Sequence, residues 1–393
     1  MKPLVWITNA PAPYRLTIFE ELASSYEFTL VLAGGSVGEH RWEKPATASY
    51  EIASLRRRWH LALWHSDVIL GKWQDPRVFG VAIFRRLLGL PSVAFYESIV
   101  ASHRFRRGPV AWARGIFFRS VDAVLTVGAA STEAIVAMKV PAERIVTGHN
   151  AVDVSYFHDR SIQLRTSMGV QSGHHFLFVG RLIPLKNVET ALRAWQQIRQ
   201  EDDTLTIVGS GPLREQLELV VSQLELSGVI CFLGYLEGPA LVSQYARAHT
   251  LVLPSTKEVW GLVVNEALAA GLHVVVSDVA GVAMSVDGTR GVYVTSPDRQ
   301  HLAGALEASR RDWRGPIANP EIPKHTQGQL AATVVEAVAL VNSICAQRWP
   351  RRFMKLGRFR SCDDAQLERD EESEVRQRCY PYSNSAPAAV GVK

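Results

Sequence analysis

Cysteine is scarce in this chain of 393 residues, which contains only four. They are Cys231, Cys345, Cys362 and Cys379. This spacing offers neither the paired ligands of a zinc site nor the framework of a disulfide-stabilised secreted domain. We therefore expect a protein of the reducing cytoplasm.

Signals for export and membrane insertion are also missing. The chain does not start with a basic region followed by an apolar core, so we expect no signal peptide. No apolar run reaches the roughly 18 residues of a membrane span, because polar residues within 265–278 interrupt the best candidate. We expect a protein that is soluble or lies on a membrane surface.

The composition is that of a folded protein, with 47% apolar and 21% charged residues. Its length allows two domains, each with its own core. Short apolar runs alternate with helical patterns, which predicts doubly wound parallel sheets. Strands are expected near 4–8, 28–32, 68–70, 93–96 and 123–127, and again near 175–179, 204–208, 229–232, 250–253 and 273–276.

The alternation of strands and helices begins again near residue 175, which predicts two Rossmann-like domains that face a cleft. We expect an acceptor-side domain over 1–155, a donor domain over 156–327 and a terminal helix over 328–345 that returns towards the first domain. The two domains would be joined around 150–165, and 34–60 would be an irregular acceptor loop. The tail, 346–393, has a basic part, an acidic part and no apolar periodicity, which predicts disorder.

Two carboxylates, Glu258 and Glu266, flank the start of a predicted helix that Gly261 opens. The first stands in a loop after an apolar run and the second lies more than a turn into the helix. A helix N-terminus attracts anions through its free N–H groups and its dipole. Carboxylates for hydroxyl groups on both sides of a phosphate-binding helix start are typical of a nucleotide-sugar site.

Upstream loops supply cations and glycines. Gly180, Arg181 and Lys186 follow a predicted strand and precede a helix that begins near Asn187, a placement that suits binding of a diphosphate. Gly209 and Gly211 follow the next strand, where they would let the backbone approach a ligand. Gly234 and Tyr235 end a third strand and would border a nucleobase. Each loop is equally compatible with an ordinary strand-to-helix turn when taken alone.

In this order and spacing, the motifs from about Phe176 to Val294 resemble the retaining glycosyltransferases of family 4, which have the GT-B fold. The resemblance implies a nucleotide-diphosphate sugar as donor, with Arg181 and Lys186 at the diphosphate and Glu266 at the ribose. It also implies that Glu258 and the backbone amides of Gly261, Leu262 and Val263 hold the transferred sugar. The loop after the first strand departs from the family pattern, since it lacks the usual pair of glycines.

Two residues of the first half are further candidates. In some members of the family a histidine of the first domain reaches the donor sugar, and His103 follows a predicted strand end; a surface histidine in a basic loop is the alternative. Glu97 stands at the same strand end, where it would act as a general base or pair with a nearby arginine.

The resemblance favours a retaining glycosyltransferase of the EC 2.4 class, with no cofactor and no metal. No Asp-x-Asp motif stands at a strand end, so the cations and the helix start would stabilise the leaving diphosphate. Polysaccharide, lipid-linked glycan and glycoconjugate synthesis are all open. A sugar phosphorylase or nucleotide-sugar epimerase on the same scaffold, or a non-catalytic partner subunit, are the alternatives.

Ten arginines crowd the first half of the chain, interleaved with tryptophan and phenylalanine. They are Arg56, Arg57, Arg58, Arg85, Arg86, Arg104, Arg106, Arg107, Arg114 and Arg119. Such clusters favour an anionic lipid acceptor or the inner face of a membrane, while solvated helix surfaces are the simpler interpretation. No nucleic-acid module accompanies them, so we expect no nucleic-acid partner.

Overall fold

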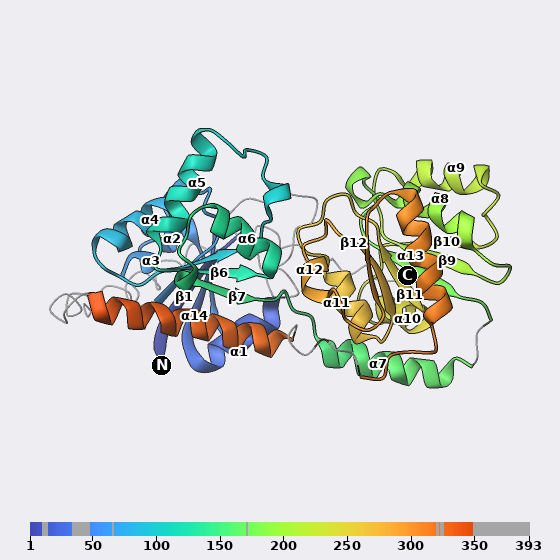
Figure 1. Ribbon diagram of the computed structural model, residues 1–393. Helices are drawn as coiled ribbons and strands as arrows, with labels where there is room; N and C mark the ends of the chain where they lie inside the picture. Colours follow the sequence, from blue (N-terminus) through green and yellow to red (C-terminus); the bar gives the residue numbers. More distant parts are fainter. Residues whose placement is uncertain are drawn as a thin grey trace, which may run out of the picture. The chain divides into compact units, whose positions relative to one another are not determined.

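Seven parallel strands form the first sheet, in the order β3-β2-β1-β4-β5-β6-β7 (Figure 1). Their bounds are β1 Lys2–Thr8, β2 Tyr26–Leu32, β3 Glu51–Ser54, β4 Asp67–Leu70, β5 Val93–Tyr96, β6 Ala123–Val127 and β7 Ile145–Gly148. Along β1, successive side chains enter opposite cores, Val5 on one face and Trp6 on the other, as the two-residue period of a strand requires. Both faces are therefore buried, which is why the strands are almost continuously apolar.

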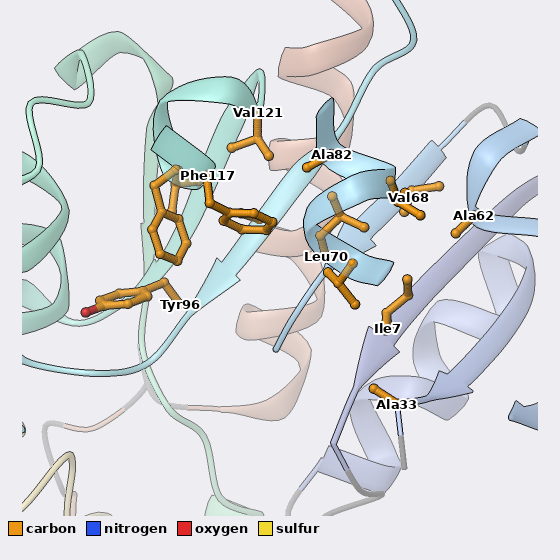
Figure 2. Packing of buried hydrophobic residues seen from close by; sticks show 14 of the residues in the cluster. Ile7, Ala33, Ala62, Val68, Leu70, Ala82, Tyr96, Phe117 and Val121 are labelled. Atoms are coloured by element: carbon orange, nitrogen blue, oxygen red, sulfur yellow. The ribbon is translucent and has the colours of Figure 1, made fainter. Parts of the chain in front are cut away.

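Helices cover both faces of this sheet. They are α1 Leu16–Ser25, α2 Leu55–Arg58, α3 Leu61–Trp64, α4 Pro76–Leu87, α5 Pro109–Ser120, α6 Ala129–Ala137 and α14 Gln327–Arg348. On one face, Ala62, Ala82 and Phe117 pack with the strand residues Ile7 and Leu70, as Figure 2 shows. On the other face, α14 lies beside α1 (Figure 1), and both contribute to the same core.

The second sheet has six parallel strands in the order β10-β9-β8-β11-β12-β13. Their bounds are β8 His175–Val179, β9 Thr204–Val208, β10 Ile230–Gly234, β11 Thr250–Leu253, β12 His273–Ser277 and β13 Val292–Thr295. Its helices are α7 Val154–Ser167, α8 Val188–Ile198, α9 Arg214–Gln223, α10 Gly238–Arg247, α11 Leu262–Ala269, α12 Ala283–Val286 and α13 Arg299–Asp312. Phe176 and Leu177 enter different cores, so this sheet is also buried on both faces.

The computed structural model describes residues 1–9, 15–33, 48–64, 67–169, 172–319, 322 and 326–348. Most of the expected tail, and the 34–47 part of the expected acceptor loop over 34–60, lie outside these residues. Met1–Arg348 form one compact unit.

Several sequence expectations need correction. The stretch 51–58, expected to be irregular, contains β3 and α2, which are too short to show a period. The junction expected around 150–165 stays a prediction, and the structure adds that most of it is helix α7, where Asp153 caps the first turn through a bond from the backbone N–H of Tyr156, 2.9 Å long. Strands β7 and β13 and helix α13 were not expected at all.

The expectation that no segment is long and apolar enough to span a membrane is wrong for α14. Gln327–Cys345 has a mean hydropathy of 1.5, so this one helix among the described residues qualifies by length and composition. Its apolar residues have a structural explanation, because Leu330, Val334 and Val338 are buried in the core beneath the first sheet. A long helix that covers a sheet passes the same test as a membrane span.

Candidate functional site

A pocket of about 260 Å³ lies at the carboxyl ends of β8 and β11. These neighbouring strands mark the point where the strand order of the second sheet reverses, and such points form the ligand crevice of doubly wound sheets. Seven residues singled out from the sequence line it, namely Glu97, Gly180, Lys186, Glu258, Gly261, Leu262 and Val263. The structure therefore brings together two motifs that are more than seventy residues apart in the chain.

The loop from β8 to α8 is fixed by backbone bonds on both sides. The N–H of Gly180 donates to Val208 (2.9 Å) and that of Leu182 to Ser210 (2.8 Å), which ties the loop to the one after β9. Asn187, in the left-handed conformation with a φ of 55°, donates its side-chain amide to the carbonyls of Pro254 (3.1 Å) and Pro297 (2.8 Å). Lys186, the residue before it, is held in place by these contacts.

The loop from β11 to α11 carries Glu258 to the same place. The N–H of Thr256 donates to the carbonyl of Leu185 (2.9 Å), and the N–H of Gly281 donates to that of Glu258 (3.1 Å). Residue 281 must be glycine here, since a Cβ would lie 1.9 Å from the carbonyl oxygen of Val259. Backbone contacts from two directions therefore orient the Glu258 side chain.

Lys186 and Glu258 form an ion pair in the pocket, between Nζ and Oε2. Their side chains are only 15% and 17% exposed, so the pair is shielded from water more than a surface pair would be. The hydroxyl of Ser255 is a second, longer donor to the same carboxylate oxygen, at 3.4 Å. In this state the lysine is occupied by a carboxylate, and an anionic ligand must compete for it.

Helix α11 begins at the pocket wall. Gly261 adopts a φ of 104°, and a Cβ there would lie 2.7 Å from the Leu253 side chain, so glycine is required by both conformation and space. No side chain caps the helix start at this described position. The first N–H groups of a helix have no partner within the helix, and Leu262 and Val263 line the pocket. This wall can therefore bind an anion.

Glu266 lies one turn further along α11 and does not line the described pocket wall. Its Oε2 accepts a bond of 2.6 Å from the hydroxyl of Tyr245, which is fully buried on α10. Burial raises the pKa of the Glu266 carboxyl, and the Tyr245 bond offsets part of that rise. A buried carboxyl with a raised pKa is common at functional sites.

The predicted glycines of the neighbouring loops have a structural role. A Cβ at Gly209 would lie 1.8 Å from the carbonyl oxygen of Gly180, and one at Gly211 would lie 2.4 Å from that of Leu182. These glycines allow close approach of the loop after β8, and so support the pocket from behind. Gly234 ends β10 and accepts a 2.7 Å bond from the N–H of Gly209.

Three other predicted residues lie away from the pocket wall. Tyr235 is 63% exposed, and its hydroxyl donates to Glu237 at 2.8 Å. Arg181 is exposed beside Gly180. His103, in the first sheet domain, shares a hydrogen bond with the hydroxyl of Tyr96 through Nε2. Burial and nearby cations, Arg114 first among them, lower the pKa of His103 to about 4, so its imidazole is neutral at pH 7.

Two pocket residues have side-chain oxygens that the described residues leave without a partner. They are Oε1 of Glu97 and Oδ1 of Asn150. The other oxygen of Glu97 pairs with Arg15, which also donates to the Thr8 hydroxyl at 3.3 Å. The sequence had left open a general base or a partner of an arginine for Glu97, and one of its two oxygens has the arginine partner. Sequence reasoning gave no role to Asn150. Buried acceptors without donors require an explanation, and a ligand that carries hydroxyl groups would supply the donors.

Comparison with known proteins gives this geometry a context. Residues 170–314 match the sequence model of the family Glycosyl transferases group 1. An uncharacterized glycosyltransferase of Methanocaldococcus jannaschii is 32% identical over 199 residues, 48% of this chain and 51% of the relative. A GDP-mannose-dependent alpha-mannosyltransferase of Mycolicibacterium smegmatis is 31% identical over 205 residues, 50% of this chain and 52% of the relative. The chain thus aligns with about half the length of these curated relatives.

Solved structures agree with the whole fold. The Anabaena protein HepE, determined in complex with UDP, has a TM-score of 0.64 at 17% identity, over 95% of this chain and 100% of that chain. Sucrose-phosphate synthase from Thermosynechococcus elongatus has a TM-score of 0.60 at 18% identity over the same shares. The predicted GT-B architecture of two Rossmann-like domains is confirmed. Within it, residues 170–314 match the sequence model of the group 1 glycosyl transferases.

Proposed function

We propose that this protein is a glycosyltransferase that moves a sugar from a nucleotide-diphosphate sugar to an acceptor hydroxyl with retention of anomeric configuration. The observation that carries the proposal is the composition of the pocket at β8 and β11. A lysine, an uncapped helix start, a carboxylate paired with that lysine and two unpartnered acceptor oxygens meet in one space. Phosphate and sugar hydroxyls together are complementary to this set.

The diphosphate would bind Lys186 and the start of α11, with Arg181 approaching from the exposed side. Negative charge develops on the diphosphate as the glycosidic bond breaks, and fixed cations and N–H groups stabilise it without reorganisation. The sugar becomes oxocarbenium-like, as in other glycosyl transfers. Glu258, released from Lys186 by the incoming phosphate, would accept hydrogen bonds from the hydroxyls of the transferred sugar.

Glu97 and Asn150 would complete the sugar site from the other side of the pocket. Oε1 of Glu97 is available as a hydrogen-bond acceptor, while Arg15 fixes the opposite oxygen. A carboxylate held in this way suits an acceptor hydroxyl that must lose its proton. Glu266 would bind the ribose, as the family resemblance implies, after its carboxyl exchanges or shares the Tyr245 bond.

The names of similar proteins support a UDP or GDP donor. A GDP-mannose-dependent enzyme is among the relatives by sequence, and HepE was solved with UDP. We propose further that no metal or cofactor is needed, that the protein acts in the cytoplasm, and that its acceptor is a hydroxyl in polysaccharide, lipid-linked glycan or glycoconjugate synthesis. The protein cations take the part that a metal plays elsewhere.

The test uses the purified full chain with a panel of UDP- and GDP-sugars and hydroxyl acceptors. Release of nucleoside diphosphate, a product with the anomeric configuration of the donor by NMR, and full activity in a chelator are the expected results. Activity that is lost with the chelator and returns with magnesium or manganese contradicts metal independence. An altered nucleotide sugar formed without acceptor indicates an epimerase, transfer to inorganic phosphate a phosphorylase, and no turnover of any donor a non-catalytic subunit.

A further inference from the structure

A second hollow, of about 530 Å³, lies on the first sheet domain, between α2 and α3 on one side and α4 on the other. Its lining is mostly apolar, with Trp59, Leu63, Val81 and Phe84. We call it the arginine-rimmed groove, because Arg56 and Arg77 are the charged residues of its lining. It shares no residue with the pocket at β8 and β11.

One face of α4 forms the floor of the groove. Arg77, Gly80 and Phe84 line it, and Leu87 and Leu88 continue the same face, since residues three and four apart are neighbours on a helix. Leu87 is 73% exposed and Leu88 is 42% exposed. The opposite face of α4 carries residues such as Ala82, which is buried against the sheet (Figure 2). The groove face of α4 is thus apolar apart from Arg77, and the core explains only the opposite face.

Glycine in the middle of α4 deepens the floor. A Cβ built at Gly80 meets no atom within 4 Å, so the position has room for a side chain that the sequence does not supply. Glycine inside a helix costs about 1 kcal/mol relative to alanine. Its presence therefore has no explanation in packing or local stability, whereas an occupant of the groove would explain it.

The other wall is held rigidly. Arg85, fully buried, donates from its guanidinium to the carbonyls of Ala62 (3.0 Å) and Leu63 (3.2 Å) at the end of α3. The ring of Trp64 meets that of Phe84 edge to face, with centroids 5.5 Å apart. Trp59 and Trp64 still leave 46% and 54% of their surface exposed. Tryptophans with one part packed and another exposed are typical of protein surfaces at a membrane interface.

Positive charge predominates around the groove. The segment 48–122 contains twelve Lys and Arg against five Asp and Glu, whereas the whole chain has a net charge of +5. The five acids have partners inside the fold, Glu51 with Arg58, Asp67 with Asn342, Asp75 with Arg77, Glu97 with Arg15 and Asp122 with Arg86. Since Arg77 and Arg86 on α4 are paired and Arg85 and Arg114 are buried, the positive charge beside the groove is contributed mainly by α2, which carries Arg56.

We propose that the arginine-rimmed groove docks the protein on an anionic phospholipid bilayer, with lipid phosphate at Arg56 and part of an acyl chain along Trp59, Gly80 and Phe84. The apolar floor and the exposed Leu87 and Leu88 match hydrocarbon, and the positive field matches anionic headgroups. An acidic peptide or a nucleic acid would satisfy the charge and leave the apolar floor without a complement. The docking goes beyond the proposed transfer reaction and does not depend on it.

The experiment fills the groove without changing charge. The full chain and its Gly80→Leu variant are mixed with vesicles of phosphatidylglycerol and phosphatidylcholine in equal parts, and with phosphatidylcholine alone, and the bound fraction is measured by flotation. Gly304→Leu is the matched control, because Gly304 also lies exposed within a helix, α13, and has no atom within 4 Å of a Cβ. The main variant leaves the charge unchanged, since basic residues beyond 348 would also attract anionic vesicles through charge alone.

Gly80→Leu is expected to lower the partition onto phosphatidylglycerol vesicles at least about tenfold, the scale of excluding a few methylene groups from apolar contact. Gly304→Leu should bind as the wild type does, and all binding should weaken as salt rises above about 0.1 M. Leu87→Glu should weaken binding as Gly80→Leu does, against Leu219→Glu, an exposed leucine of α9. Wild-type binding by folded Gly80→Leu, or equal binding to phosphatidylcholine alone, overturns the proposal. Nucleotide binding, measured in parallel, keeps this result separate from the proposed transfer.

Discussion

Replacing Lys186 by Met tests the ion pair at the centre of the pocket. The substitution removes the ammonium and keeps a flexible chain of similar length, so Glu258 remains in place with the Ser255 hydroxyl at 3.4 Å as a second donor. A pair exposed at the surface contributes up to about 1 kcal/mol, and breaking a fully buried one costs about 3–5 kcal/mol. With side chains 15% and 17% exposed, this pair lies between these limits. We expect Lys186→Met to lose about 2 kcal/mol.

A double-mutant cycle isolates the pair from the other effects of each substitution. Lys186→Met, Glu258→Gln and the double variant are unfolded in urea, and a coupling free energy of roughly 1–3 kcal/mol is expected for residues in direct contact. Most of the loss in Lys186→Met should return in the double variant, because no uncompensated carboxylate then remains in the pocket. A coupling below about 0.5 kcal/mol would refute the reasoning, since distant residues show that much.

Binding of a nucleoside diphosphate gives the same cycle a functional readout. The ligand must take Lys186 from Glu258, so Glu258→Gln should bind UDP or GDP at least as tightly as the wild type does, although it should transfer sugar poorly. Lys186→Met should bind the same nucleotide at least about tenfold more weakly, the scale of a lost charge-assisted bond. Equal weakening in both variants, measured by calorimetry, would show that the two residues do not compete.

Three further outcomes are expected. Glu266→Gln should weaken binding of the nucleoside diphosphate, measured by calorimetry, without lowering the stability of the free protein. The stability should not fall because burial raises the pKa of this carboxyl, and its ionised form opposes folding once the pH exceeds that pKa. Gly209→Ala, with its Cβ 1.8 Å from the Gly180 oxygen and a φ of 140°, should lose at least about 2 kcal/mol in urea unfolding, the range of severe local strain, whereas Gly228→Ala, where a Cβ meets nothing within 4 Å, should not. Burial lowers the pKa of His174 from 6.5 to about 3. Between these two pH values the unfolded chain binds a proton at His174 that the folded chain does not, so stability should fall as the pH drops from about 6.5 towards 3. His174→Gln should flatten that part of the plot of stability against pH.

The sequence was most informative where a strand is followed by glycine and a helix. Gly180 with Lys186, and Glu258 with Gly261, were predictable as loops at strand carboxyl ends, and the alternation of elements implied that such ends share one edge of a sheet. That β8 lies directly beside β11 follows from the doubly wound order, which is a rule of parallel sheets and not a property of either motif. The pocket residues from these two loops could therefore be predicted together.

Edge strands were harder to predict for a physical reason. Strands β3, β7 and β13 lie at the edges of their sheets and are only partly buried, whereas β4, β5 and β11, equally short, lie inside the sheets and are almost fully buried. A partly exposed strand does not need a continuous apolar run, so its pattern stands out less from chance. The apolar pattern of α14 could be recognised in the sequence, but the surface that it packs against could not. Whether an apolar helix of that length lies in lipid or on a sheet depends on what covers it, and here residues of β1 and α1 do so.

Gly209 and Gly211 were correctly predicted to allow close approach to the backbone, but the approaching group differs from the expected ligand. A Gly-x-Gly turn after a strand predicts close approach of a backbone, and the sequence alone does not say whether the approaching group is a ligand or another loop. At Gly209 and Gly211 the neighbour is the loop that carries Gly180. Substitution there would disturb donor binding through the position of Gly180, so loss of activity alone would not distinguish the two causes. Unfolding measurements on the ligand-free chain do distinguish them.

Asn150 and Glu97 mark the limit of motif reasoning in this pocket. Neither lies near the Glu258 motif in sequence, and nothing in the residues around them specifies which atom will lack a donor. The information arises only when Oδ1 of Asn150 and Oε1 of Glu97 are buried without partners in the described structure while lining the same space as the Lys186–Glu258 pair. A buried acceptor without a donor destabilises the free protein, and a hydroxyl-bearing ligand removes that loss. In the proposed function, acceptors that folding leaves unsatisfied would contribute to sugar binding at this wall. A sequence does not show this contribution, because each atom is ordinary until the fold excludes water from it.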